Sequence, residues 1–124
     1  MSEVRLTFKE MCAKFDVTPR TLRYYEYIEL LQPDREGRSR FYTPREVGRM
    51  KLIMRGRKFG FSLEDIRQWL DLYDDGPENQ VQMNSWIELA DRQLNELEIR
   101  KAQIEEAIAE LKTLRDQTAE NLKT

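Results

Sequence analysis

The chain lacks histidine altogether and has a single cysteine, Cys12, among its 124 residues. Without histidine it lacks the commonest general base and the commonest zinc ligand, and no Ser/His or Cys/His pair can form. A lone cysteine excludes a disulfide within the chain and is typical of a reducing compartment, so we expect a cytoplasmic protein. Because the remaining acidic pairs are ordinary on helix surfaces, we predict no enzyme activity, no metal site and no cofactor.

Long apolar runs are also missing. No stretch approaches the roughly 20 apolar residues that a membrane span needs, so we expect no membrane partner. Residues 1–5 lack the apolar core of a signal peptide.

The net charge is only −2, but it is unevenly distributed. Residues 1–60 carry 14 Lys and Arg against 8 Asp and Glu, a net charge of +6. Residues 61–124 carry 7 against 15, a net charge of −8. A basic first half and an acidic second half suggest a head that binds a polyanion and a solvated tail.

Proline and glycine are few, and residues 78–117 contain neither. The clearest breaker is Asp74-Asp75-Gly76-Pro77, which predicts a boundary between a domain at residues 1–75 and another at residues 76–124.

Two short helices are predicted near the N-terminus. Thr7 and Glu10 have the spacing of a capping box for a helix that ends near Phe15. Thr18 is a good N-cap and Pro19 suits the first helical position, so a second helix is predicted to about Ile28. Two short helices joined by so tight a turn are typical of a helix-turn-helix.

One face of the second helix carries basic and phenolic side chains. Arg20, Arg23 and Tyr24 lie three and four residues apart, so they share that face. Guanidinium and phenol groups on one side of a short helix suit a reader of the DNA major groove. The alternative is a solvated face with arginines that extend their charge into water.

Residues 31–42 predict a small β-hairpin, or wing, that turns at Gly37 and carries Arg38 and Arg40. The alternative is an ordinary Arg-rich surface loop. Thr43-Pro44-Arg45-Glu46 then repeats the N-cap, proline and capping-box pattern for a helix to about Phe59. Ser62-Leu63-Glu64-Asp65 caps another helix to about Tyr73.

From about Glu78 to Gln117 a long helix is predicted with an apolar heptad seam. The seam consists of Met83, Ile87, Ala90, Leu94, Leu97, Lys101, Ile104, Ile108 and Leu111. A small head cannot bury so narrow and long a stripe, so a partner helix is required. Lys101 either sets the register of the pairing or extends its charge out of the seam.

The sequence resembles the MerR family of bacterial transcription regulators over about residues 5–73. The residues that carry the resemblance are Val17-Thr18-Pro19-Arg20-Thr21-Leu22-Arg23-Tyr24-Tyr25-Glu26, Leu31, Pro33, Arg35, Arg40-Phe41-Tyr42 and Gly60-Phe61-Ser62-Leu63-Glu64-Asp65-Ile66. The resemblance implies a mainly α fold, with a winged helix-turn-helix DNA-binding head, a small β-hairpin wing and a long C-terminal dimerisation helix in an antiparallel coiled coil. It implies a homodimer that binds pseudo-palindromic, double-stranded promoter DNA and bends and untwists the promoter spacer for RNA polymerase.

The resemblance also implies the site residues. Those expected at DNA are Thr18, Arg20, Thr21, Arg23 and Tyr24 on the recognition helix, Arg38, Arg40 and Tyr42 on the first wing, and Arg57 and Lys58 in the second wing region. Tyr25 is expected to pack rather than touch DNA. Those expected at the dimer interface are Ile87, Ala90, Leu94, Leu97, Ile104, Ile108 and Leu111.

The chain departs from the family pattern in three ways. Glu29 and Asp16 stand where the family usually has glycine. No cysteine follows Cys12, so the thiolate site of metal-sensing members is not expected, and Cys12 is expected to be a buried structural thiol. We expect a short form without an appended effector domain.

A narrower resemblance, at residues 15–18 and 50–63, is to short members that regulate leucine, isovalerate and related acyl-CoA catabolism. It suggests control of branched-chain amino-acid or fatty-acid breakdown genes, with an acyl-CoA thioester as effector. No residue identifies its pocket; Trp69, Tyr73 and Trp86 near the junction are the first place to look. Two other functions stay open: a non-specific DNA-architectural protein, and a coiled-coil interaction protein whose head no longer binds DNA.

Overall fold

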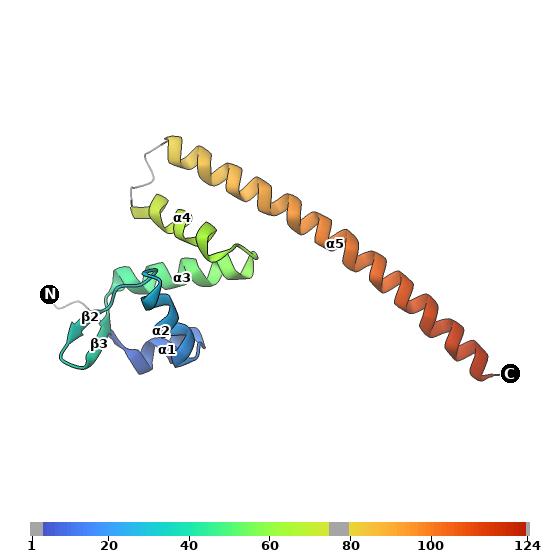
Figure 1. Ribbon diagram of the computed structural model, residues 1–124, viewed down its shortest axis with the longest axis horizontal. Helices are drawn as coiled ribbons and strands as arrows, with labels where there is room; N and C mark the ends of the chain where they lie inside the picture. Colours follow the sequence, from blue (N-terminus) through green and yellow to red (C-terminus); the bar gives the residue numbers. More distant parts are fainter. Residues whose placement is uncertain (1–3, 75–79, 124) are drawn as a thin grey trace. The chain divides into compact units, whose positions relative to one another are not determined.

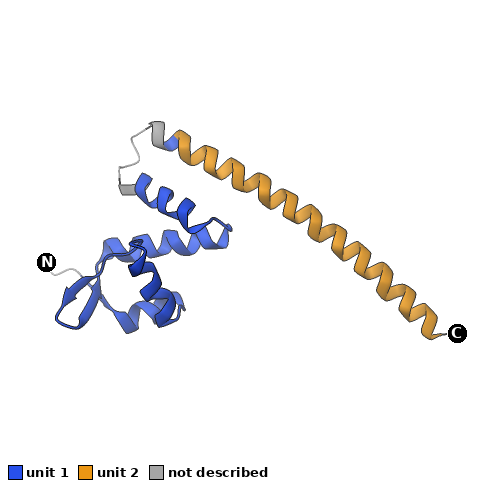
Figure 2. Cartoon of the chain, in the orientation of Figure 1, with its two compact units in different colours: residues 1–83 blue, residues 84–124 orange. Residues whose placement is uncertain are grey.

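The computed structural model describes residues 4–74 and 80–123. The chain forms two compact units, residues 1–83 and residues 84–124, which are coloured separately in Figure 2. Most of the predicted breaker, from Asp75 to Pro77, lies outside the described residues. The predicted domain boundary between residues 75 and 76 therefore stays a prediction.

The first unit is a small helical head with one sheet (Figure 1). Its elements in chain order are β1 (Leu6–Thr7), α1 (Phe8–Phe15), α2 (Pro19–Tyr27), β2 (Asp34–Glu36), β3 (Ser39–Tyr42), α3 (Pro44–Lys58) and α4 (Leu63–Asp74). This order confirms the predicted helix pair, the hairpin and the second helix pair. The sheet is antiparallel in the order β1-β3-β2, and its short edge strand β1 was not predicted.

Local capping explains where the helices begin. The Thr7 hydroxyl accepts the Glu10 N–H at 3.1 Å, and the Glu10 carboxylate accepts the Thr7 N–H at 2.9 Å, which confirms the predicted capping box. Thr18 caps α2 by accepting the Thr21 N–H at 3.1 Å. Each cap satisfies a backbone donor that has no partner within its helix.

Two turns use left-handed backbone without glycine. Asp16 has φ 51° and Glu29 has φ 64°, each just after a helix of the helix-turn-helix. These are the two positions where the family usually has glycine. Glycine adopts a positive φ without steric strain, whereas Asp16 and Glu29 adopt it with a Cβ present.

The core of the head is shared by its four helices, the strand β3 and the segment after α2. Its fully buried side chains are Met11, Leu22, Tyr25, Leu30, Leu31, Tyr42, Met50, Ile53, Ile66 and Leu70. Gly56 lets α3 and α4 approach closely, because a Cβ there would lie 2.6 Å from Cγ1 of Ile66. Cys12 is only partly buried, and desolvation raises the pKa of its thiol.

The second unit is part of a single helix, α5 (Gln80–Leu122), which continues beyond the predicted end at Gln117. Along it, the seam residues Ile87, Leu94, Ile104, Ile108 and Leu111 are each about half exposed or more. Ala90 and Leu97 are intermediate, and Lys101 is exposed. In the described part of the chain, no helix is long and apolar enough to cross a membrane.

Candidate nucleic-acid interface

The outward face of α2 carries the predicted recognition residues. Arg20, Arg23 and Tyr24 are exposed, and Tyr24 retains 48% of its accessible surface. Tyr27 is more exposed still, at 83%, and was not among the predicted DNA-binding residues. Its spacing, four residues after Arg23 and three after Tyr24, is the signal that places it on this face.

Thr18 and Thr21 shape the start of this helix. The Thr18 hydroxyl accepts the Thr21 N–H and also donates to the Thr21 hydroxyl at 3.0 Å. Both threonines therefore fix the cap of α2 and lie at the end of the helix that presents Arg20.

A cleft of about 370 Å³ joins α2 to the wing formed by β2 and β3. Its lining residues are Thr7, Phe8, Lys9, Arg23, Arg38, Ser39, Arg40 and Phe41. The structure thus brings Arg23, predicted on the recognition helix, together with Arg38 and Arg40, predicted on the wing. It also adds Lys9 from the first turn of α1, which was not predicted. Four cationic side chains around one cleft suit the phosphates of a DNA backbone.

Phe8 holds two of these arginines in place. The guanidinium carbon of Arg23 lies 5.3 Å from the centre of the Phe8 ring, and that of Arg40 lies 5.2 Å from it. Cation–π contacts at this distance orient guanidinium groups without neutralising them. The recognition helix and the wing therefore share one aromatic support.

Glu26, on the inner side of α2, ties the wing to the recognition helix. Its side chain is only 6% exposed, and one carboxylate oxygen lies 3.3 Å from Nε of Arg40 and 3.7 Å from Nη2 of Arg35. The other oxygen accepts a hydrogen bond from the Tyr42 hydroxyl. A buried carboxylate requires such partners, so Glu26 fixes the wing at the edge of α2.

Tyr42 corrects one sequence prediction. It was expected to contact DNA, but its side chain is fully buried and its hydroxyl is bound to Glu26. Burial is the main cause that raises the pKa of the Tyr42 phenol, and the hydrogen bond to Glu26 adds to it. Tyr42 therefore supports the surface from beneath and does not line it.

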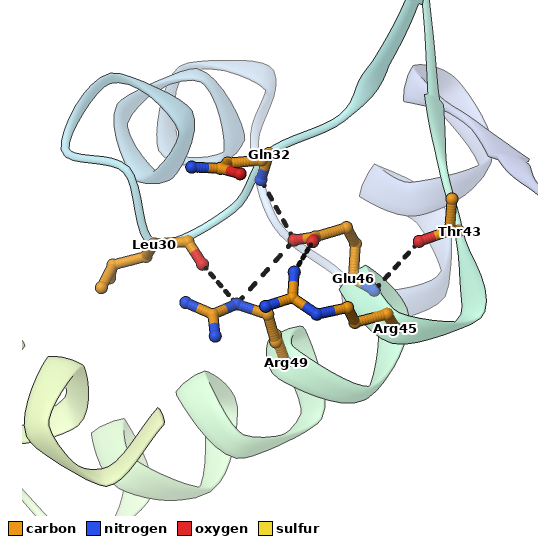
Figure 3. Close-up of polar contacts among 6 residues, drawn as sticks. All are labelled: Leu30, Gln32, Thr43, Arg45, Glu46 and Arg49. Carbon is orange, nitrogen blue, oxygen red and sulfur yellow. Dashed lines mark hydrogen bonds and ion pairs between the residues drawn. The ribbon is translucent and has the colours of Figure 1, made fainter. Parts of the chain in front are cut away.

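A second buried carboxylate, Glu46, fixes α3 against the segment that follows α2 (Figure 3). One oxygen accepts the backbone N–H of Gln32 at 3.0 Å, and the other accepts Nη1 of Arg45 at 2.8 Å. The Thr43 hydroxyl accepts the Glu46 N–H at 3.5 Å, as predicted for the N-cap. In place of the reciprocal bond of a capping box, the carboxylate reaches a residue distant in the sequence. Arg49 adds a bond from Nε to the Leu30 carbonyl at 3.0 Å.

The second wing region also attaches to α2. Nη1 of Arg57 donates to the Tyr25 hydroxyl at 2.9 Å, and Arg67 donates to the Ile28 carbonyl. Tyr25 is buried, which confirms that it packs. Arg57 and Lys58 are exposed at the end of α3.

Of the residues suggested for an effector, Trp69 packs with Phe61 at 6.0 Å between ring centres, and the side chain of Tyr73 lies outside the described residues.

Comparisons with known proteins now identify the family. Residues 6–72 match the family described as MerR HTH family regulatory protein, and residues 47–117 match that described as MerR, DNA binding. The chain belongs to the MerR family of transcriptional regulators. Over 109 residues it is 34% identical to the HTH-type transcriptional regulator ZntR of Escherichia coli strain K12. The aligned region covers 86% of this chain and 76% of ZntR.

Two solved structures share the architecture. PbrR691 from Ralstonia metallidurans CH34, in complex with lead(II), has a TM-score of 0.66 at 26% identity and covers 89% of this chain and 85% of its own. HiNmlR, described as a MerR family regulator lacking the sensor domain and bound to promoter DNA, has a TM-score of 0.65 and covers 85% of this chain and 79% of its own. At 20% identity, HiNmlR shows the fold alone.

One of these two proteins, PbrR691, is solved in complex with a metal, lead(II). This MerR-family chain has one cysteine and no histidine. Within residues 4–74 and 80–123, no three His, Cys, Asp or Glu side chains are grouped so that they could hold a metal ion.

Proposed function

We propose that this MerR-family regulator acts as a homodimer that recognises pseudo-palindromic promoter sites. Each α2 would enter a major groove with Arg20, Arg23, Tyr24 and Tyr27, while the wing follows the flanking phosphates. The observation that carries the proposal is the cleft in which Arg23 of α2 and Arg40 of the wing meet over Phe8. One continuous basic surface then spans both elements.

The proposal extends to how the promoter is used. The protein, in the cytoplasm, would bend and untwist the promoter spacer so that RNA polymerase can use it, with specificity partly from DNA shape. The division into a DNA-binding domain at residues 1–75 and a dimerisation helix at residues 76–124 is part of this proposal. The seam on α5 would pair with that of a second copy in an antiparallel coiled coil.

We also propose that its targets include genes of branched-chain amino-acid or fatty-acid catabolism, with an acyl-CoA thioester as effector. The support is the resemblance at residues 15–18 and 50–63. Footprinting of the DNA upstream of its own and neighbouring genes, with and without a panel of acyl-CoAs, tests both points. A protected palindrome whose affinity changes with one thioester is the expected result, and unchanged affinity with every thioester would contradict the effector.

The decisive variant is Arg23→Ala, measured by fluorescence anisotropy on the protected fragment and on a random duplex. Loss of this contact should weaken promoter binding by about 1–3 kcal/mol. Arg100→Ala, on the exposed surface of α5, is the matched control and should leave affinity unchanged. Equal affinity of the parent protein for both duplexes would favour the architectural alternative. No binding to either would favour the interaction-protein alternative.

A further inference from the structure

A second hollow lies along the exposed face of α3. Its volume is about 700 Å³, and none of its lining residues lines the cleft between α2 and the wing. Its apolar part consists of Phe15 from α1 and of Leu52 and Met54 from α3, all only partly covered. The proposed DNA surface does not use this groove, apart from Lys58 at its end.

Cations border the apolar part. Lys51, Arg55 and Lys58 are four and three residues apart, so they lie along one side of α3. Arg45 and Arg49, which also line the groove, are held by Glu46. By contrast, the side chains of Lys51, Arg55 and Lys58 make no hydrogen bond or ion pair with any residue that the structure describes. Their charge is available to a ligand.

We propose that this groove binds a small amphipathic anion, an alkyl or acyl chain that carries phosphate. The volume falls within the range of small-molecule sites, which are mostly apolar with a few polar groups that fix orientation. Several cations beside one apolar strip complement a dianionic head attached to an apolar chain. A nucleic-acid backbone would leave Phe15, Leu52 and Met54 uncovered, because it offers no apolar chain.

The acyl-CoA thioesters proposed above as effectors also carry an acyl chain and phosphate groups, and to that extent the inference rests on the proposed function. Binding to the groove does not depend on it. The test therefore measures ligand binding to the whole 124-residue chain without DNA, so that its failure leaves the promoter-binding proposal untouched.

The probe is octyl phosphate below its micelle concentration, measured by isothermal titration calorimetry. Octanol, inorganic phosphate and octanoate are the comparison ligands. Octyl phosphate should bind more tightly than each of them, because only it offers both the chain and the dianionic head. Equal or tighter binding of octanoate would show that the groove does not select a phosphate head group. Equal binding of inorganic phosphate would show that the apolar chain adds nothing to affinity. Either result would overturn the proposal.

Two variants locate the site. Arg55→Glu should weaken octyl phosphate by about tenfold, because it reverses a charge beside the head group. Gly48→Trp should block the groove, since a Cβ at Gly48 meets no atom within 4 Å and the ring can occupy the hollow. Gly48→Ala and Lys112→Glu, on the exposed surface of α5, are the matched controls and should bind as the parent does.

Unchanged binding in both Arg55→Glu and Gly48→Trp would overturn the site. The site would also be overturned if Arg55→Glu lost promoter affinity but still bound octyl phosphate, because Arg55 would then contact DNA and not the ligand. Association with phosphatidylglycerol vesicles but not with octyl phosphate would overturn a soluble ligand in favour of a membrane surface.

Discussion

The hydroxyl of Tyr42, in the last residue of the wing, donates a hydrogen bond to the carboxylate of Glu26 on the recognition helix. Both side chains are almost entirely buried. Together with the ion pairs of Arg40 and Arg35 with Glu26, this contact joins the element that would read bases to the element that would follow the backbone. It holds the two at a fixed spacing before any DNA is present.

Tyr42→Phe should therefore destabilise the head. The change keeps the ring but removes the hydroxyl donor to one oxygen of the buried Glu26 carboxylate, while Arg40 and Arg35 still face the other oxygen. Loss of a hydrogen bond to a charged group costs about 1.5–3 kcal/mol. Tyr27→Phe removes a hydroxyl from an exposed ring and is the matched control, with no expected change. Urea denaturation followed by circular dichroism measures both. Equal midpoints for the two variants would show that the Tyr42 bond adds nothing.

The same contact predicts a pH dependence. Burial and Glu26 raise the pKa of Tyr42 in the folded state above its ordinary value of 10.0, so the folded state keeps the proton that the unfolded state loses. The stabilisation is complete below pH 10 and is lost as the pH rises above it. The difference in unfolding free energy between the parent and Tyr42→Phe should therefore shrink above that pH. A difference that stays constant in alkaline solution would contradict this assignment.

Glu29→Gly should stabilise the protein. Glu29 has φ 64°, a backbone conformation that costs a residue with a Cβ roughly 1–2 kcal/mol of steric strain and that glycine adopts without this strain. The larger conformational entropy that glycine loses on folding offsets part of the gain. Asp16→Gly, at φ 51°, should gain less, because Asp tolerates this conformation better. Asp71→Gly, on the exposed side of α4, is the control with the opposite sign, since glycine weakens a helix. Thermal unfolding should rank the variants in that order.

The two glycines of α3 should respond differently to alanine. Gly56→Ala places a Cβ against Ile66 in the core and should cost about 1–3 kcal/mol through overpacking. Gly48→Ala meets no neighbouring atom on an exposed face and should gain up to about 1 kcal/mol from helix propensity. Chemical denaturation of both variants checks the pair. A stable Gly56→Ala protein would mean that α4 shifts to make room at little cost.

Leu97→Glu should dissociate the proposed dimer, because it places a charge in the seam of α5. Glu98→Gln, one residue along and exposed, is the control and should remain associated. Sedimentation velocity across a concentration series distinguishes the species. A variant that still sediments as a dimer would show that the seam passes elsewhere on the helix. The exposed residues Ile99, Leu114 and Leu122 would be the next to test.

Much of the head could be predicted from the sequence because its signals are local. Thr7, Thr18 and Thr43 each cap a helix through a backbone donor three residues ahead, so neighbouring residues decide where these helices begin. The shared face of Arg20, Arg23 and Tyr24 follows from helical spacing alone. Positions 29 and 16, where the family usually has glycine, both have positive φ although Glu29 and Asp16 occupy them.

What only the tertiary structure decided depends on partners far apart in the chain. The alternation of side chains along β3 places Tyr42 on one face of the strand. It does not predict that Glu26, sixteen residues earlier, accepts a hydrogen bond from the Tyr42 hydroxyl. Glu46 has the spacing of a capping box, yet it bonds to Gln32 because folding brings that unpaired N–H to it. The meeting of Arg23 and Arg40 over Phe8 likewise needs three elements packed together. Local hydrogen bonds and periodicity thus fix the elements, whereas burial and the need to satisfy buried charge decide which side chains remain at the surface.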